Sequence, residues 1–120
     1  MKMPRPDGED RAFFLSVLPK DLRIHVRPMF GNDAAFVNGN MFIGLFGKEL
    51  FVRLSVEDQA ELLVEEGASR FAPMKGRPMS DYIVVPNAWR SNPKKVGEWV
   101  ARSLAWSSGL PAKAPKKSKS

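Results

Sequence analysis

The chain has 120 residues, enough for one domain with a hydrophobic core of its own. Its content of 43% hydrophobic and 27% charged residues is typical of a globular protein. It has no cysteine and one histidine, His25. This composition excludes disulfides, a thiolate nucleophile and a cysteine-ligated metal, and argues against a histidine-rich metal site, so we predict no metal and no cofactor.

The net charge of +6 is concentrated at the C-terminus. Residues 109–120 contain four lysines and no acid, whereas the other 108 residues hold 15 basic and 13 acidic side chains. We expect residues 109–120 to be a disordered tail, because their alanine, proline, lysine and serine residues cannot bury enough apolar surface. The tail lysines are Lys113, Lys116, Lys117 and Lys119.

The N-terminal residues 1–8 are polar and predict a flexible leader without the apolar segment of a signal peptide. No apolar run approaches the length of a membrane span, so we predict a cytoplasmic protein. A first helix is expected from about Glu9 to Leu18, capped by Asp7 or Gly8 and closed by Pro19. From Ile24 the period changes to that of a strand, and Pro28 places this strand at an edge or at a bulge.

An antiparallel meander is predicted next. Residues 31–33 read as a turn, residues 35–37 as a strand, and Asn38-Gly39 as a type I′ hairpin turn. We expect Phe36-Val37 to pair with Met41-Phe42 across that turn. The returning strand runs to Phe46, and Gly47-Lys48 leads into a strand from Leu50 to Leu54, whose alternate residues face opposite sides of the sheet.

The clearest helix is predicted from about Val56 to Glu66, with Ser55 as N-cap and Gly67 just past its end. An apolar stripe is formed by Val56, Ala60, Leu63 and Val64. A different face carries Glu57, Glu61 and Glu65, a row that reads as solvated rather than as a catalytic acid pair.

A strand from about Ser80 to Val85 and a last helix capped by Asn92, with Pro93 at its first position, complete the predicted domain of residues 9–108. The last helix should bury Val96, Trp99, Val100 and Leu104. The order of elements predicts an α+β fold, a two-layer sandwich with helices packed on one face of an antiparallel sheet.

The candidate chemistry is sparse. His25 could act as a general base, but no nucleophile is placed beside it, and a structural strand histidine is the favoured interpretation. The sheet phenylalanines could form a base-stacking platform, yet core or interface packing is favoured. Arg70, Lys75 and Arg77 could attract an anion or a partner, although ordinary solvated loop charges are the favoured interpretation.

The motifs resemble those of the TfoX/Sxy family, bacterial proteins associated with competence regulation, in its N-terminal domain. The resemblance covers residues 12–105 and is carried by Arg27-x-Met29-Phe30-Gly31, Asn38-Gly39-x-Met41-Phe42, Leu50-Phe51-Val52-Arg53, Gly76-Arg-Pro78-Met79-Ser80 and Val85-Pro86. Asn32 stands where the family usually has a second glycine. The resemblance implies a small α+β fold, no known catalytic residues, and action through partners.

Our leading hypothesis is a non-enzymatic regulatory or adaptor domain that binds another protein, with a homodimer as one partner arrangement. The alternative is a nucleic-acid-associated accessory protein that uses the basic tail and the Arg70/Lys75/Arg77 loop. Binding through the tail lysines would be weak and blind to sequence, with a log–log salt slope of roughly −3 to −4.

Overall fold

The computed structural model describes residues 6–29, 32–72 and 81–112. The elements in chain order are α1 (Gly8–Ser16), β1 (Ile24–Met29), β2 (Asn32–Val37), β3 (Asn40–Phe46), β4 (Glu49–Arg53), α2 (Val56–Leu63), β5 (Ser69–Arg70), β6 (Tyr82–Val84), the 3₁₀ turn η1 (Asn87–Ser91) and α3 (Pro93–Ser108). Among them the sequence did not predict η1. The three α-helices and the sheet confirm the predicted α+β class.

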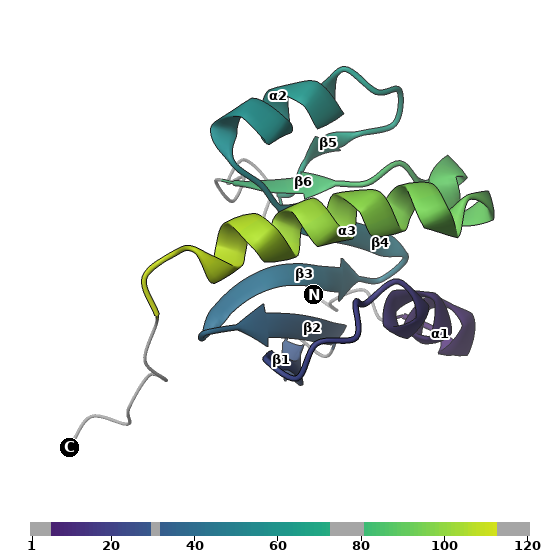
Figure 1. The fold of residues 1–120 in the computed structure, drawn as a ribbon. Helices are drawn as coiled ribbons and strands as arrows, with labels where there is room; N and C mark the ends of the chain where they lie inside the picture. The colour runs from purple at the N-terminus through teal and green to yellow at the C-terminus, as the bar shows by residue number, and fades with distance from the viewer. Residues whose placement is uncertain (1–5, 30–31, 73–80, 113–120) are drawn as a thin grey trace.

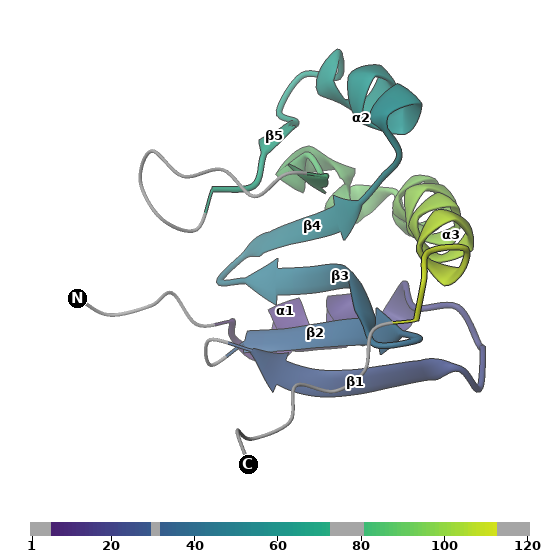
Figure 2. The same cartoon turned by 90° about the vertical axis from the view of Figure 1, so that its left-hand side faces the viewer.

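The strands form one six-stranded antiparallel sheet in the order β1-β2-β3-β4-β6-β5. The first four strands are the predicted meander. The chain then passes through α2 and adds β6 beside β4, with the short β5 outermost. Figure 1 views the sheet from the side on which α3 crosses it, and Figure 2 shows α2 and α3 on the same side.

The two edge strands of the sheet differ in length and in the features that limit pairing with another strand. β5 has two residues, and β1 is the edge strand that Pro28 predicted. Val37 and Asn40 flank a two-residue turn, so the backbone groups of Val37 point to β3 and those of its neighbour Phe36 point to β1. Phe36 pairs with His25, and backbone direction alternates along a strand. The backbone groups of Ile24, Val26 and Pro28 therefore point away from the sheet. Pro28 has no N–H, and the N–H of Ile24 donates to the carbonyl of Asp21 at 3.1 Å. Along β1, all of which is described, only Val26 can then offer an outward N–H, so this edge is a poor template for pairing.

The hairpin is confirmed, with Asn38 and Gly39 at φ of 51° and 78° as a type I′ turn requires. The predicted pairing of residues 36–37 with the returning strand is also present, and the structure adds one irregularity to it. Val37 pairs with Asn40 and Phe36 with Met41, but Ala35 pairs with Ile43, so Phe42 is the extra residue of a β-bulge. The bulge turns Phe42 to the helix-covered face beside Ile43, while Met41 stays on the opposite face.

Both carbonyls of the bulge are satisfied by side chains. The Ser103 hydroxyl of α3 donates to the Phe42 carbonyl at 2.6 Å, and the Tyr82 hydroxyl of β6 donates to the Met41 carbonyl at 3.0 Å. Burial raises the pKa of Tyr82, which keeps this hydroxyl protonated as a donor. Two hydrogen bonds from residues far away in the sequence thus stabilise the bulge by pairing its backbone carbonyls.

The predicted turn at residues 31–33 was wrong in part, because Asn32 and Asp33 belong to β2, whereas Gly31 lies outside the described residues. Asn32 is buried and pairs across from Met29 of β1. Its side-chain oxygen accepts the backbone N–H of Gly47 at 2.8 Å. The residue that departs from the usual family glycine therefore ties the start of β2 to the β3–β4 turn.

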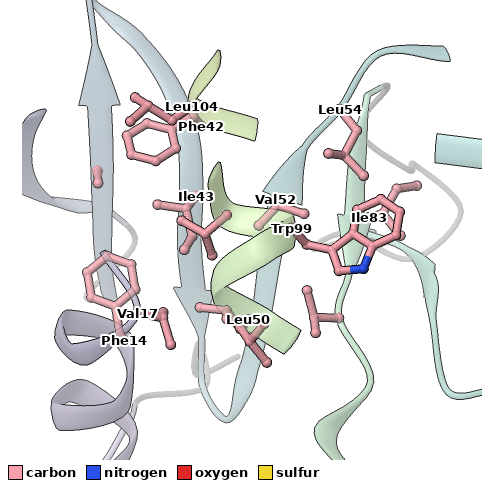
Figure 3. Packing of buried hydrophobic residues seen from close by; sticks show 14 of the residues in the cluster. Phe14, Val17, Phe42, Ile43, Leu50, Val52, Leu54, Ile83, Trp99 and Leu104 are labelled. Carbon is pink, nitrogen blue, oxygen red and sulfur yellow. The ribbon is translucent and has the colours of Figure 1, made fainter. Parts of the chain in front are cut away.

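The main core lies between the helices and the sheet (Figure 3). It includes Phe14 and Val17 from the N-terminal segment, the inward residues of β2, β3 and β4, and the predicted face of α3, namely Val96, Trp99, Val100 and Leu104. A second cluster lies on the opposite face of the sheet and consists of Ala34, Met41, Phe51, Phe71, Tyr82 and Val84. Both faces of the central strands are therefore apolar.

The N-cap of α2 is the one predicted from the sequence. Ser55 has extended backbone angles, and its hydroxyl accepts the N–H of Asp58 at 3.3 Å. The helix ends earlier than expected, at Leu63, and Gly67 follows with φ of 93°.

Replacement of Ser55 by alanine is expected to lower the free energy of unfolding by about 1 kcal/mol, because one N–H of the first turn loses its partner. Urea denaturation of wild type and variant measures this difference. Equal midpoints and equal slopes for the two proteins would show that the cap contributes nothing.

Candidate functional site

The exposed side of α2 carries three of the four residues of the predicted apolar stripe. The helix buries Gln59 and Leu62 against the core, and Leu63 packs partly against it. Val56, Ala60 and Val64 are instead exposed, with Val56 and Val64 at 74% and 80% of their full accessible area. These three residues recur every fourth position and lie on one side of the helix, hereafter the α2 face.

A buried polar network fixes α2 to the sheet. The Gln59 amide nitrogen donates to the carbonyl of Leu54 at 2.9 Å and to Asp81 Oδ1 at 3.2 Å. Its amide oxygen accepts from Arg70 at 3.1 Å. Both the nitrogen and the oxygen of the buried amide are therefore hydrogen-bonded, which fixes the orientation of α2 relative to the sheet.

Asp81 completes this network from an unusual backbone conformation. Its φ is 76°, in the left-handed region that non-glycine residues rarely adopt. The conformation lets the Asp81 carbonyl accept from Leu54 at 2.8 Å while its carboxylate lies 3.5 Å from Arg53. The Arg53 guanidinium also lies near the Tyr82 and Trp106 rings, at 5.6 and 5.7 Å from their centroids.

Helix α3 holds the other side of α2. Arg102 lies 3.1 Å from Glu61 and 3.4 Å from Asp58, and its guanidinium stacks on Trp99 at 4.3 Å from the ring centroid. The hydrogen bond with Glu61 raises the pKa of Arg102. The α2 face is thus presented by a helix that is capped, hydrogen-bonded and bridged, rather than by a loosely attached segment.

The predicted anion or partner patch is only partly visible. Arg70 is exposed at the sheet edge but donates to Gln59, whereas Lys75 and Arg77 lie outside the described residues, as do Lys113, Lys116, Lys117 and Lys119 of the tail. Most of the described arginines form ion pairs with carboxylates, namely Arg11, Arg23, Arg53, Arg90 and Arg102. Those side chains are engaged in ion pairs within the described part of the fold.

The family-motif residues belong to the sheet. Arg27 stacks on the Phe36 ring at 4.1 Å from its centroid, and Met29 packs partly against the second cluster. Gly39 forms the hairpin turn, and Met41 and Phe42 form the bulge. Phe30 and Gly31 lie outside the described residues.

The remaining candidate residues, His25 and the sheet phenylalanines, lie on the strands. His25 is exposed on β1, opposite Phe36. Phe36, Phe46 and Phe51 share the face away from the helices, but Arg27 covers Phe36, and Phe51 is buried in a stack with Phe71. Within residues 6–29, 32–72 and 81–112, no group of three or more acidic or histidine side chains could hold a metal ion. None of the helices in these ranges is long and apolar enough to cross a bilayer.

Sequence reasoning missed the residues that anchor the α2 face. Gln59 looked like an ordinary helix residue, and Asp81 like a residue of the strand predicted from about Ser80 to Val85, so neither gave a signal. The one available hint was the pair of valines, since β-branched residues on an exposed helix surface lower helix propensity without a packing gain.

Comparison with known proteins agrees with this architecture. The profile of the TfoX N-terminal domain matches residues 20–106, from just before β1 to within α3. The chain belongs to the TfoX N-terminal domain family. Among curated proteins, none matches the chain in sequence.

Membership of the TfoX N-terminal domain family suggests a regulatory domain of the competence type. The matched residues include all six strands and α2, so the α2 face is part of the TfoX N-terminal domain itself. Helix α1 precedes the matched range and is joined to the domain by the Asp10–Arg90 ion pair at 2.7 Å. This link makes α1 an integral part of the folded unit.

Proposed function

We propose that this TfoX N-terminal domain is a non-enzymatic regulatory adaptor that binds another protein through the α2 face. The observation that carries the proposal is the exposure of Val56 and Val64 on a helix whose opposite side is firmly anchored. Exposed valines add nothing to the stability of a helix, whereas a partner that covers them gains apolar burial.

The remaining chemistry supports an adaptor rather than a catalyst. The most buried described ionic group, Asp10, is paired with Arg90, and the pairs of Arg11, Arg53 and Arg102 also link segments that are distant in the sequence. These contacts organise structure and leave no nucleophile with an adjacent base among the described residues. The protein would then work by bringing its partner into a regulatory complex.

Site-specific photocrosslinking in the native cell tests the proposal. A photoreactive residue at position 64 should capture a defined protein after nuclease treatment, and the same residue at Lys94 on α3 should not. Addition of Val56→Glu should remove the crosslink, since it places a charge on the same face. A position-64 yield no higher than that at position 94, or capture of nucleic acid alone, would contradict the proposal.

The nucleic-acid alternative remains a prediction that depends on the tail. DNA affinity measured across a salt series should have a slope of roughly −3 to −4 for the full chain and should vanish on truncation. The truncation belongs after Ala112, because the buried Asn40 side chain donates to the Pro111 carbonyl at 3.1 Å. Tight, salt-resistant and sequence-selective binding by the truncated protein would favour a nucleic-acid function instead.

A further inference from the structure

We infer that the α2 face binds an amphipathic helix of another protein, one whose apolar ridge is flanked by lysine or arginine. This inference rests on the proposed function and specifies the chemistry of its partner. It is carried by the shape of the α2 face and by the distribution of charge around it.

The shape favours a helix as the partner. Val56, Ala60 and Val64 form a ridge of side chains four residues apart, and such ridges pack into the grooves of a second helix. The smallest side chain, Ala60, lies at the centre of the ridge, where two helix axes would approach most closely. The bulkier valines on either side would then contact the partner on both sides of the crossing.

The charge favours a basic flank on that helix. Residues 56–66 contain five of the 13 acidic side chains of the chain and no lysine or arginine, in a protein whose net charge is +6. Glu57 and Glu61 are exposed along one side of the ridge. Arg102 forms ion pairs with Asp58 and Glu61 and partly neutralises their charge. Among the described residues, neither Glu57 nor Glu65 has an ion-pair partner. A lysine or arginine beside the partner's ridge would meet this acidic border.

A second copy of the chain is a poor occupant of the same face. Two antiparallel α2 helices related by a two-fold axis would place their Glu57 and Glu61 flanks opposite each other, and like charges in an interface are unfavourable. Edge pairing through β1 is also weak, because Pro28 lacks an N–H and that of Ile24 is already bonded. Self-association therefore does not account for the exposed ridge.

Binding to three designed peptides tests the inference. The peptides, of about 15 residues so that a helix can form, share one leucine and alanine ridge and carry lysine, glutamine or glutamate on its flanks. The full-length protein should bind the lysine peptide at least about tenfold more tightly than the glutamate peptide at low salt, and this ratio should fall at high salt. Backbone NMR shifts should change mainly in α2.

Three exposed-residue variants locate the effect. Val64→Glu should abolish binding of the lysine peptide, and Glu57→Lys should weaken it about tenfold while improving that of the glutamate peptide. Glu49→Lys makes the same charge change at the exposed first residue of β4 and should alter the affinity little. Circular dichroism and unfolding midpoints check that each variant is folded.

The inference fails if the lysine and glutamate peptides bind equally, if Val64→Glu binds as wild type does, or if Glu57→Lys and Glu49→Lys have the same effect. A failed peptide test together with a position-64 crosslink would leave the adaptor function standing and show that the partner has different chemistry. Peptide binding without a cellular crosslink would instead contradict the adaptor function.

Discussion

Replacement of Gly44 by alanine is expected to destabilise the protein by about 2 kcal/mol, in the range typical of overpacked cores. A Cβ on Gly44 would lie 2.5 Å from Cζ of Phe51, whose ring crosses the glycine from the neighbouring strand. That ring is buried and stacks on Phe71, with centroids 3.9 Å apart and planes 12° from parallel. It therefore has little room to move away.

A matched control is available in Gly97 of α3, where an added Cβ meets nothing within 4 Å. Gly97→Ala should stabilise the protein by about 0.5 to 1 kcal/mol, because alanine is the better helix former. Thermal or urea unfolding of both variants measures the contrast. If Phe51 causes the loss, Gly44→Ala should cost less in a Phe51→Leu background; the same cost in both backgrounds would rule this explanation out.

Replacement of Arg90 by alanine is expected to lower the free energy of unfolding by about 3 kcal/mol at neutral pH, because it leaves a buried carboxylate uncompensated. Asp10 is 1% exposed, and its Oδ1 lies 2.7 Å from the Arg90 guanidinium. Arg90 also donates to the Lys48 carbonyl at 3.0 Å and lies over the Phe13 ring. One side chain thus joins α1, the β3–β4 turn and η1.

The pH dependence follows from the pKa of Asp10. Burial alone would raise this pKa, but the hydrogen bond from the Asp7 N–H and the contact with Arg90 outweigh burial and lower the pKa below 3.8. A carboxyl with a lowered pKa contributes stability above its unfolded-state pKa of about 3.9 and loses it as the pH falls through the folded-state pKa. The difference between wild type and Arg90→Ala should therefore be largest at neutral pH and shrink below about pH 4.

Two further variants separate the buried pair from ordinary surface charge. Arg11→Ala removes a more exposed ion pair with Asp33 and should cost less than about 1 kcal/mol. Asp10→Asn combined with Arg90→Leu should be more stable than Arg90→Ala alone, because no charge remains buried without a partner. A cost for Arg90→Ala that matches that of Arg11→Ala, or one that does not change with pH, would contradict this account.

Local chemistry was sufficient to predict much of this fold from the sequence. Asn38-Gly39 dictates a type I′ turn because both positions need positive φ, and Ser55, Asn92 and Asp7 cap helices through their own short side chains. Pro28 marked an edge strand because proline cannot donate to a ladder. The alternation of Leu50, Val52 and Leu54 with Phe51 likewise assigned the two faces of β4 correctly.

Tertiary structure decided the features that depend on residues far apart in the chain. The bulge at Phe42 needs Ser103 and Tyr82 to satisfy its carbonyls, which no local pattern reveals. The rotation of α2 was set by the buried Gln59 and Leu62, so Val56, Ala60 and Val64 of the predicted apolar stripe face solvent, whereas Leu63 packs partly against the core. Helical periodicity alone indicates which residues share a face of a helix, but only the neighbouring elements determine which face is covered. The candidate binding surface of this domain was therefore determined by packing.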